Sequence, residues 1–505
     1  MSTLIASAAP AGRQVARNTL YNVLGQGMPL LAGLVAIPIT ANALGAARFG
    51  LLGLAWAILG YAAIFDLGLG RATTKFVAQY LGASDRGGLP GVVTVAVASQ
   101  TALGVIAGAA LAALAPLAGA VLHVPPALRV EARGMLLALA LCVPFVVLAA
   151  SLRAVLEAAQ RFDLVNLIRT PTSVATFVVP AAAAAMGASL STIVLLLLVL
   201  RAGSCWAAVA VLPRAIPGFR WALRPGWTLL RPLLRYGGWV AVSNAVSPLL
   251  VYLERFLLAS LAGVTAVAYY TAPYEAVTRL LIVPGALAGA LFPAFSAGGA
   301  VTATRGDSER ALGRPLRFLL LTLAPPVIIV VTCAGPLLTL WLGPTYAARS
   351  AAAFAILGLG VLINGIAFVP YTYLLGQSRP DIPAKFHLFE LPLYIVAGWV
   401  LIRAWGVNGA ALAWSLRVTL DTLLLVAAVA RRTKVPAAQL FGERGGRAMV
   451  AVAGFGAFAA GAAALLGSPG TRLVVVAAAS AAFAAVAWVF VLDDVERAGL
   501  RRLWV

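Results

Sequence analysis

Apolar runs of about 20 residues recur from one end of the sequence to the other, and short polar connections separate them. A helical run of this length crosses the hydrocarbon core of a bilayer. We predict fourteen transmembrane helices, with twelve as the alternative if one weak pair is misread. The predicted spans are residues 18–43, 50–70, 90–114, 134–157, 169–187, 190–212, 238–260, 268–293, 318–341, 351–376, 388–405, 408–430, 448–467 and 473–492. The expected fold class is an all-α polytopic membrane protein.

The composition agrees with this pattern. The chain has 505 residues, of which 62% are hydrophobic and 10% are charged, whereas a soluble protein has about 25% charged residues. The cysteines, Cys142, Cys205 and Cys333, fall in separate predicted helices, so no disulfide framework is expected. The first apolar run is too long for a signal peptide and is expected to be a retained first helix.

The net charge of +21 comes mostly from arginines that gather in alternate connections. This distribution follows the positive-inside rule and predicts that both termini are cytoplasmic. The rule accounts for most of the basic surplus, so nucleic acid is not an expected partner, and anionic membrane lipids are.

The longest predicted cytoplasmic connection, 213–237, contains Trp221, Trp227 and spaced arginines. This composition favours a helix lying in the membrane interface. Since the connection follows the sixth predicted span, we expect it to join two halves. The expected parts are an N-terminal six-helix lobe at 1–212, the linker at 213–237, a C-terminal six-helix lobe at 238–431, and two additional helices with a cytoplasmic tail at 432–505.

A weak internal repeat supports two pseudo-symmetric lobes. Residues 44–50 and 261–269 are both small-residue turns that enter a span through an aromatic residue. Asn22 and Asn244 occupy comparable early positions in the first and seventh spans. Repeats of this kind place the substrate site of many transporters at the interface between the halves.

Four charges lie inside the apolar runs of 249–295, namely Glu254, Arg255, Glu275 and Arg279. A charge at the bilayer centre costs at least about 2.5–3.5 kcal/mol. Glu275 and Arg279 share a helix face, and the antiparallel direction of the two spans puts all four at similar depth. We interpret Arg255 and Arg279 as binding an anionic headgroup, with the two glutamates as their partners or as a coupling-ion site. The alternative is a purely structural network of ion pairs.

Other intramembrane polar residues are further candidates. Arg201 has no acid nearby on its own helix, so it is a candidate for contacting the substrate, as is Arg417, whose alternative is a pair with Asp421. Arg153 and Glu157 are expected at the interface, and His387 is not expected to be a ligand. The coupling-ion or charge-pair candidates are Glu254, Glu275, Asp421, Asp66 and Glu390. The polar and aromatic candidates for lining a cavity are Asn22, Asn244, Tyr252, Tyr270, Tyr274 and Asn364.

Two stretches, 18–79 and 252–296, carry a family resemblance. The first has an asparagine opening its span, the LG..RFG turn and the Asp66-Leu67-Gly68-Leu69-Gly70 run before a basic residue. The second has Leu253-Glu254-Arg255-Phe256 and Phe292-Pro293, with Glu254 where the family usually has aspartate. These motifs resemble those of Wzx-type oligosaccharide flippases of the multidrug/oligosaccharidyl-lipid/polysaccharide exporter superfamily.

The resemblance implies two six-helix lobes in a V shape, two extra C-terminal helices and alternating access around a cationic cavity. It implies that an undecaprenyl-pyrophosphate-linked oligosaccharide moves from the inner to the outer leaflet of the bacterial inner membrane for cell-surface polysaccharide biosynthesis. The implied protein is a transporter and not an enzyme, with proton or sodium coupling, no metal cofactor, and polysaccharide-assembly proteins as candidate partners.

Three alternatives remain. A lipid II flippase would also have an arginine-rich cavity. A multidrug or cation antiporter calls for net acidic intramembrane charge, and the first span here has no acid. A membrane polysaccharide polymerase or ligase usually carries its catalytic residues on a sizeable outer loop, and the longest predicted outer loop, 116–133, is short.

Overall fold

The computed structural model describes residues 12–62, 69–82, 87–222, 227–296, 309–442, 444–494 and 496–497. Every regular element within these ranges is helical. The chain divides into two compact units, unit 1 formed by Met1–Phe256 and Gly263–Thr265, and unit 2 formed by Leu257–Ala262 and Ala266–Val505. The predicted lobe and linker boundaries stay a prediction beside this division.

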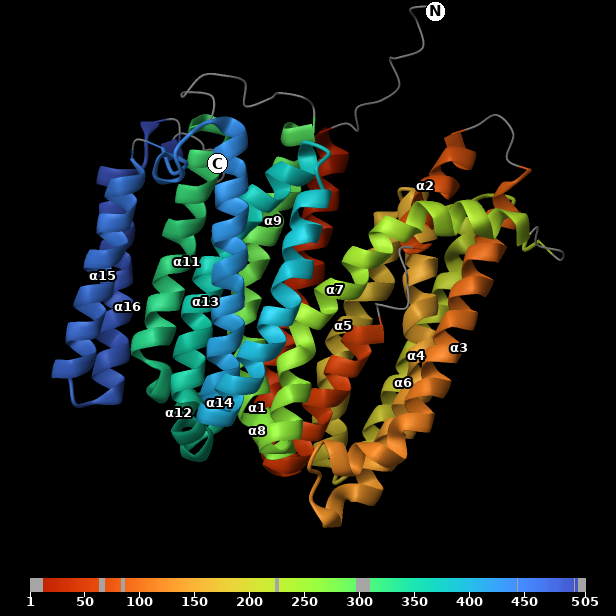
Figure 1. The fold of residues 1–505 in the computed structure, drawn as a ribbon, viewed down its shortest axis with the longest axis horizontal. Helices are drawn as coiled ribbons and strands as arrows, with labels where there is room; N and C mark the ends of the chain where they lie inside the picture. The colour runs from red at the N-terminus through yellow and green to blue at the C-terminus, as the bar shows by residue number, and fades with distance from the viewer. Residues whose placement is uncertain are drawn as a thin grey trace, which may run out of the picture. The chain divides into compact units, whose positions relative to one another are not determined.

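Unit 1 is built from long helices with short connections. Its elements are α1 (Gly12–Tyr61), α2 (Leu69–Gly82), α3 (Leu89–Val121), η2 (Pro126–Leu128), α4 (Arg129–Ala158), α5 (Phe162–Ala185), α6 (Leu190–Ala215), η3 (Trp227–Leu229) and most of α7 (Leu230–Ala262). Figure 1 shows α3, α4 and α6 side by side. Small residues allow α3 and α4 to pack closely, because a Cβ atom at Gly108 would meet the carbonyl oxygen of Ala140.

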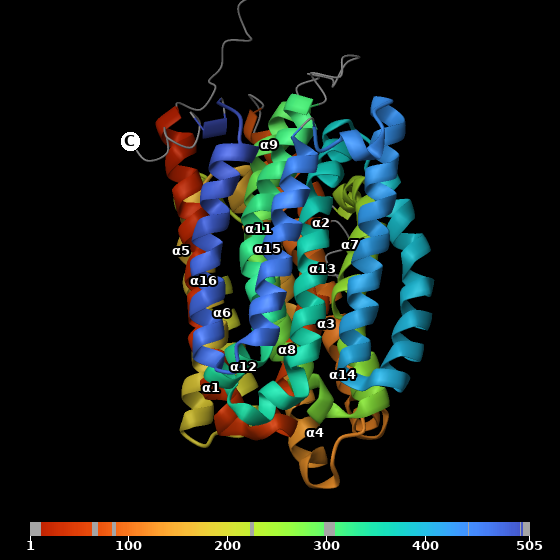
Figure 2. The same ribbon diagram turned by 90° about the vertical axis from the view of Figure 1, so that its left-hand side faces the viewer.

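Unit 2 is also built from helices with mostly short connections. Its elements are α8 (Val264–Thr278), η4 (Arg279–Leu281), α9 (Ile282–Ser296), η5 (Glu309–Gly313), α11 (Arg314–Thr332), α12 (Ala334–Leu342), α13 (Pro344–Gly376), α14 (Asp381–Thr433), η6 (Ala437–Gln439), α15 (Gly445–Leu465), α16 (Pro469–Val486) and η7 (Ala487–Val491). Figure 2 shows α15 and α16 running together along one side of unit 2, where α15 packs on α11.

The predicted all-α polytopic class is confirmed. Among the described residues, 11 helices are long and apolar enough to cross a membrane. Two of them each hold a pair of predicted spans, because the backbone leaves helical geometry at Gly45 (φ 71°, ψ 164°) in α1 and at Gly406 (φ 52°, ψ −122°) in α14. Each of the fourteen predicted segments lies at least in part on a helix.

The helix that carries Arg279 changes its geometry shortly before Pro284. Proline has no N–H to donate to the carbonyl group of Leu280, four residues before it. The helix tightens to the 3-10 turn η4 at Arg279–Leu281 between α8 and α9. Arg279 therefore lies where the α-helix α8 passes into a 3-10 turn.

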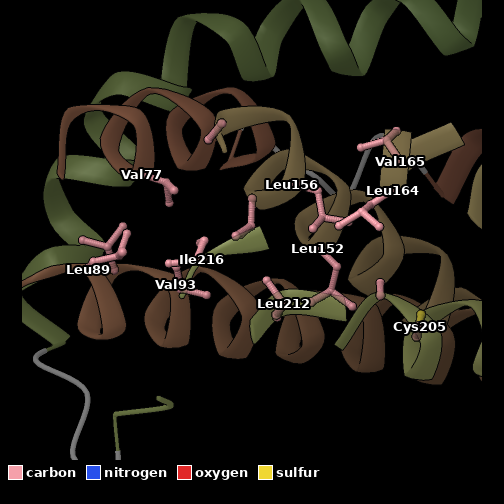
Figure 3. Close-up of a cluster of buried hydrophobic side chains, with 14 residues drawn as sticks. Val77, Leu89, Val93, Leu152, Leu156, Leu164, Val165, Cys205, Leu212 and Ile216 are labelled. Atoms are coloured by element: carbon pink, nitrogen blue, oxygen red, sulfur yellow. The ribbon is translucent and has the colours of Figure 1, made fainter. Parts of the chain in front are cut away.

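One buried cluster of aliphatic side chains in unit 1 lies near the α4–α5 connection. Figure 3 shows Leu152, Leu156 and Leu164 gathered together, with Leu212 nearby, and none of these four is more than 8% exposed. Because α4, α5 and α6 all contribute to this cluster, it fixes their positions relative to one another.

Candidate functional site

The charged pair of α7 is fully buried. Glu254 and Arg255 are both 0% exposed. The Arg255 guanidinium lies 5.5 Å from the centre of the Tyr252 ring, which itself packs on Tyr61 at 5.7 Å between ring centres. A Cβ atom at Gly60 would overlap the Tyr252 ring, so the glycine allows this contact. The end of α1 thus positions the aromatic face that contacts the Arg255 cation.

The second predicted charge pair lies in unit 2. The Arg279 Nη2 atom donates to Oε2 of Glu275 at 2.9 Å, and its Nε atom donates to the Glu275 carbonyl oxygen at 3.3 Å. The Arg279 and Glu275 side chains are 31% and 17% exposed. This is the i,i+4 geometry expected from the sequence. Arg255 belongs to unit 1, so its juxtaposition with Arg279 stays a prediction.

A third group of charges lies on the two halves of α14. His387 Nε2 is 3.9 Å from Asp421 Oδ1, and Glu390 is 0% exposed within electrostatic reach of Asp421 and Arg417. The Arg417 guanidinium stands 5.8 Å from the centre of the Tyr394 ring. None of the ion pairs found in the described residues joins Arg417 to Asp421. Both interpretations of Arg417, substrate contact and pairing with Asp421, stay predictions.

His387 was not expected to be a ligand, yet it faces the buried carboxylate of Asp421. The spacing of His387, Glu390 and Tyr394 places them on one helix face, which is the signal that identifies this group. The backbone break at Gly406 separates α14 into the two parts that carry His387 and Asp421. The group joins an imidazole, two carboxylates and a guanidinium, a set that can hold or move a proton.

The aromatic candidates pack in the interior. Tyr270 is 0% exposed and lies 5.5 Å from Tyr274, whose ring meets Trp414 edge-on at 5.6 Å between ring centres. Asn364 is partly buried in α13. Their expected role in lining a cavity stays a prediction. Asp66 and the side chains of Asn22 and Asn244 lie outside the described residues.

Arg201 lies near the middle of α6 and lines a cavity of about 250 Å³ in unit 1. Arg153 of α4 and Arg169 of α5 line the same cavity. Sequence spacing did not bring these three together, because they lie on different helices. Arg153 forms the expected i,i+4 pair with Glu157 at 3.6 Å.

Two arginine–aspartate ion pairs lie outside the apolar spans. Arg161 donates to Asp163 at 2.7 Å, and this hydrogen bond raises the pKa of Arg161. Arg314 pairs with Asp493 at 3.0 Å. Burial raises the pKa of Asp493, but the hydrogen bond from the Glu496 N–H and the nearby Arg314 outweigh it, so the pKa lies below its ordinary value.

Residues 15–298 match the family described as "Polysaccharide biosynthesis protein". The chain is 29% identical over 419 residues to a "Putative O-antigen transporter" of Shigella flexneri, covering 81% of this chain and 96% of that protein.

Solved structures share the fold. An inward-facing multidrug resistance MATE family transporter of the MOP superfamily aligns with a TM-score of 0.69 at 14% identity, covering 82% of this chain and 98% of that one. The lipid II flippase MurJ in an inward closed conformation aligns with a TM-score of 0.68 at 11% identity, covering 94% and 99%. The family match bears out the predicted resemblance, and the two solved structures show the same fold. The chain therefore belongs to the polysaccharide biosynthesis protein family, with the multi-pass fold of the MOP superfamily transporters.

Proposed function

We propose that this protein is a flippase that moves an undecaprenyl-pyrophosphate-linked oligosaccharide from the inner to the outer leaflet of the bacterial inner membrane. The transported precursor serves cell-surface polysaccharide biosynthesis. The family match and the similarity to a protein named as a putative O-antigen transporter support this substrate class.

The observation that carries the proposal is the fully buried Arg255, in an apolar stretch of α7 within the family-matched region. An intramembrane guanidinium costs several kcal/mol and marks a functional site by default. Its planar fork matches the oxygens of a pyrophosphate, with which it can form two parallel hydrogen bonds. Arg279 is the second proposed contact, and it lies in the 3-10 turn η4 between α8 and α9. Glu254 and Glu275 act as their partners.

In this proposal, transport proceeds by alternating access with both termini in the cytoplasm. Coupling to a proton or sodium gradient would be carried by the α14 group, with Asp421 and Glu390 as the carboxylates and His387 beside them. Glu254 and Glu275 are the other candidates for this role. Polysaccharide-assembly enzymes and membrane lipids are the expected partners.

Glycan export in cells that lack their own flippase tests the headgroup assignment. Arg279→Ala should abolish surface polysaccharide when export is compared at matched protein levels. Arg403→Ala is the matched control, because its exposed side chain stacks on Trp399 at 4.3 Å from the ring centre and has no proposed substrate contact. Normal export by the Arg279 variant would exclude this residue from the substrate site.

A lipid II flippase is the second candidate function. The MurJ structure covers 94% of this chain, a larger share than the 82% covered by the multidrug transporter, although its 11% identity supports the fold alone. The two functions differ in a complementation assay. Restored growth of cells depleted of their lipid II flippase would favour this candidate, whereas restored surface polysaccharide without restored growth would favour the oligosaccharide flippase.

A further inference from the structure

A cavity between α4, α5 and α6 is lined by one arginine from each of these helices. Arg153, Arg169 and Arg201 line its volume of about 250 Å³ together with apolar side chains such as Val146 and Ile168. Its wall shares Leu156, Val165 and Ala208 with the aliphatic cluster of Figure 3. Close packing in this cluster therefore fixes the relative positions of the three helices that carry the arginines.

Acids balance only part of the positive charge of this cavity. Glu157 is the one carboxylate paired with a lining arginine among the described residues, and it stands 3.6 Å from Arg153. No ion pair of a described residue includes Arg169 or Arg201, and the buried Nε atom of Arg201 has no hydrogen-bond partner there. Arg153 and Arg169 are exposed, whereas Arg201 is partly buried. A poorly hydrated guanidinium without a counter-charge, as at Arg201, is unfavourable. An anion in the cavity would supply the missing partner.

The location is one that a lipid headgroup reaches. Arg153 is five residues before the end of α4 and Arg169 is seven residues after the start of α5, which is about 8–11 Å of helix from the connection between them. Arg161 in that connection bonds the carbonyl oxygen of Arg214 at 2.9 Å, so the end of α6 lies at the same end of unit 1. The positive-inside pattern assigns this end to the cytoplasm.

The volume and the lining residues of the cavity indicate which chemical group it can bind. Its volume is below the roughly 300–1,000 Å³ of pockets that hold drug-sized molecules, so it fits a phosphate or pyrophosphate group and not an oligosaccharide. Guanidinium forks match phosphate oxygens, and the Ser173 hydroxyl in the wall is a further donor. Apolar neighbours suit the hydrocarbon that follows the headgroup.

We propose that the cavity lined by Arg153, Arg169 and Arg201 binds the phosphate-bearing headgroup of a membrane lipid, at a site separate in the chain from Arg255 and Arg279. This goes beyond the proposed flippase function and stands without it, because binding is measured in the absence of transport. The lipid is either a polyprenyl pyrophosphate carrier or an anionic phospholipid, and the two share the same recognition chemistry.

The test measures lipid binding to purified full-length protein by native mass spectrometry, with thermal unfolding recorded in parallel. The probes are a polyprenyl pyrophosphate, phosphatidylglycerol, phosphatidylcholine and inorganic pyrophosphate. The variants are Arg201→Gln, which removes the deepest charge, and Ala149→Phe, which fills the cavity. Arg133→Gln is the control, since this exposed arginine is near the opposite end of α4.

We expect at least one of the two anionic lipids to bind about tenfold more weakly to both cavity variants, a change of about 1.4 kcal/mol, and equally well to the control. Preference for the polyprenyl pyrophosphate would assign the carrier, and preference for phosphatidylglycerol would assign bulk lipid. Without lipid, Arg201→Gln should unfold at the same temperature as the wild type or a higher one, whereas a structural role would lower it. Unchanged lipid affinity in the Arg201 variant, or binding of inorganic pyrophosphate alone, would overturn the proposal.

Discussion

The Glu275–Arg279 pair offers a test that separates a structural role from a substrate role. The two side chains are joined at 2.9 Å and are 31% and 17% exposed. A fully exposed helix pair contributes about 0.3–0.5 kcal/mol, and partial burial increases this, so we expect a coupling energy of about 1–2 kcal/mol. Each single change, Arg279→Gln or Glu275→Gln, should destabilise the protein because it leaves the other charge in a poorly hydrated site.

The double variant distinguishes the two roles. Removing both charges leaves no unpaired group, so thermal stability in detergent should return close to that of the wild type. Export of surface polysaccharide should not return, because the guanidinium that contacts the headgroup is still missing. Recovery of both stability and export in the double variant would refute the assignment of Arg279 to the substrate.

Three further predictions concern other parts of the chain. Gly45→Ala should destabilise the protein by about 1–3 kcal/mol in thermal unfolding, since the φ of 71° and ψ of 164° at Gly45 suit glycine alone. The control, Gly27→Ala in the same helix, should stabilise the protein by about 0.5–1 kcal/mol. Equal effects of the two substitutions would exclude backbone strain at Gly45. Asp493→Asn should lower the unfolding temperature at neutral pH by removing the ion pair with Arg314. Because the pKa of Asp493 is lowered in the fold, this difference should vanish as the pH falls through that pKa, and a pH-independent difference would contradict the assigned cause. Asp421→Asn should remove the stimulation of transport by an imposed proton or sodium gradient in proteoliposomes, and unchanged stimulation would exclude Asp421 from coupling.

The apolar runs predicted the long helices, but not α2, which lies mostly between the predicted spans 50–70 and 90–114. The α1 and α14 helices each carry two apolar runs, and a glycine at the boundary, Gly45 or Gly406, marks where the backbone departs from helical geometry. The position of the break at Arg279–Leu281 was less accessible to sequence reasoning. Pro284 has no N–H to donate to the carbonyl group four residues earlier, so the change in geometry precedes the proline.

Spacing along one helix can predict a contact between charged side chains, but it cannot predict which side chains meet between helices. The i,i+4 spacing predicted the Glu275–Arg279 pair, which the structure contains. The same spacing leaves the role of Arg417 a prediction, and Asp421 Oδ1 lies 3.9 Å from His387 Nε2 on the other half of α14. The arginines around the unit 1 cavity lie on three helices, and only their packing brings them together.

Translocation by purified protein tests the central claim most directly. Protein reconstituted in proteoliposomes would be given a fluorescent polyprenyl-pyrophosphate-linked oligosaccharide, and its movement between leaflets would be measured beside protein-free vesicles and the Arg255→Gln variant. The proposed function predicts fast movement with the wild-type protein and movement close to the protein-free rate with the variant. A wild-type rate equal to that of protein-free vesicles, or an Arg255 variant as fast as the wild type, would contradict it.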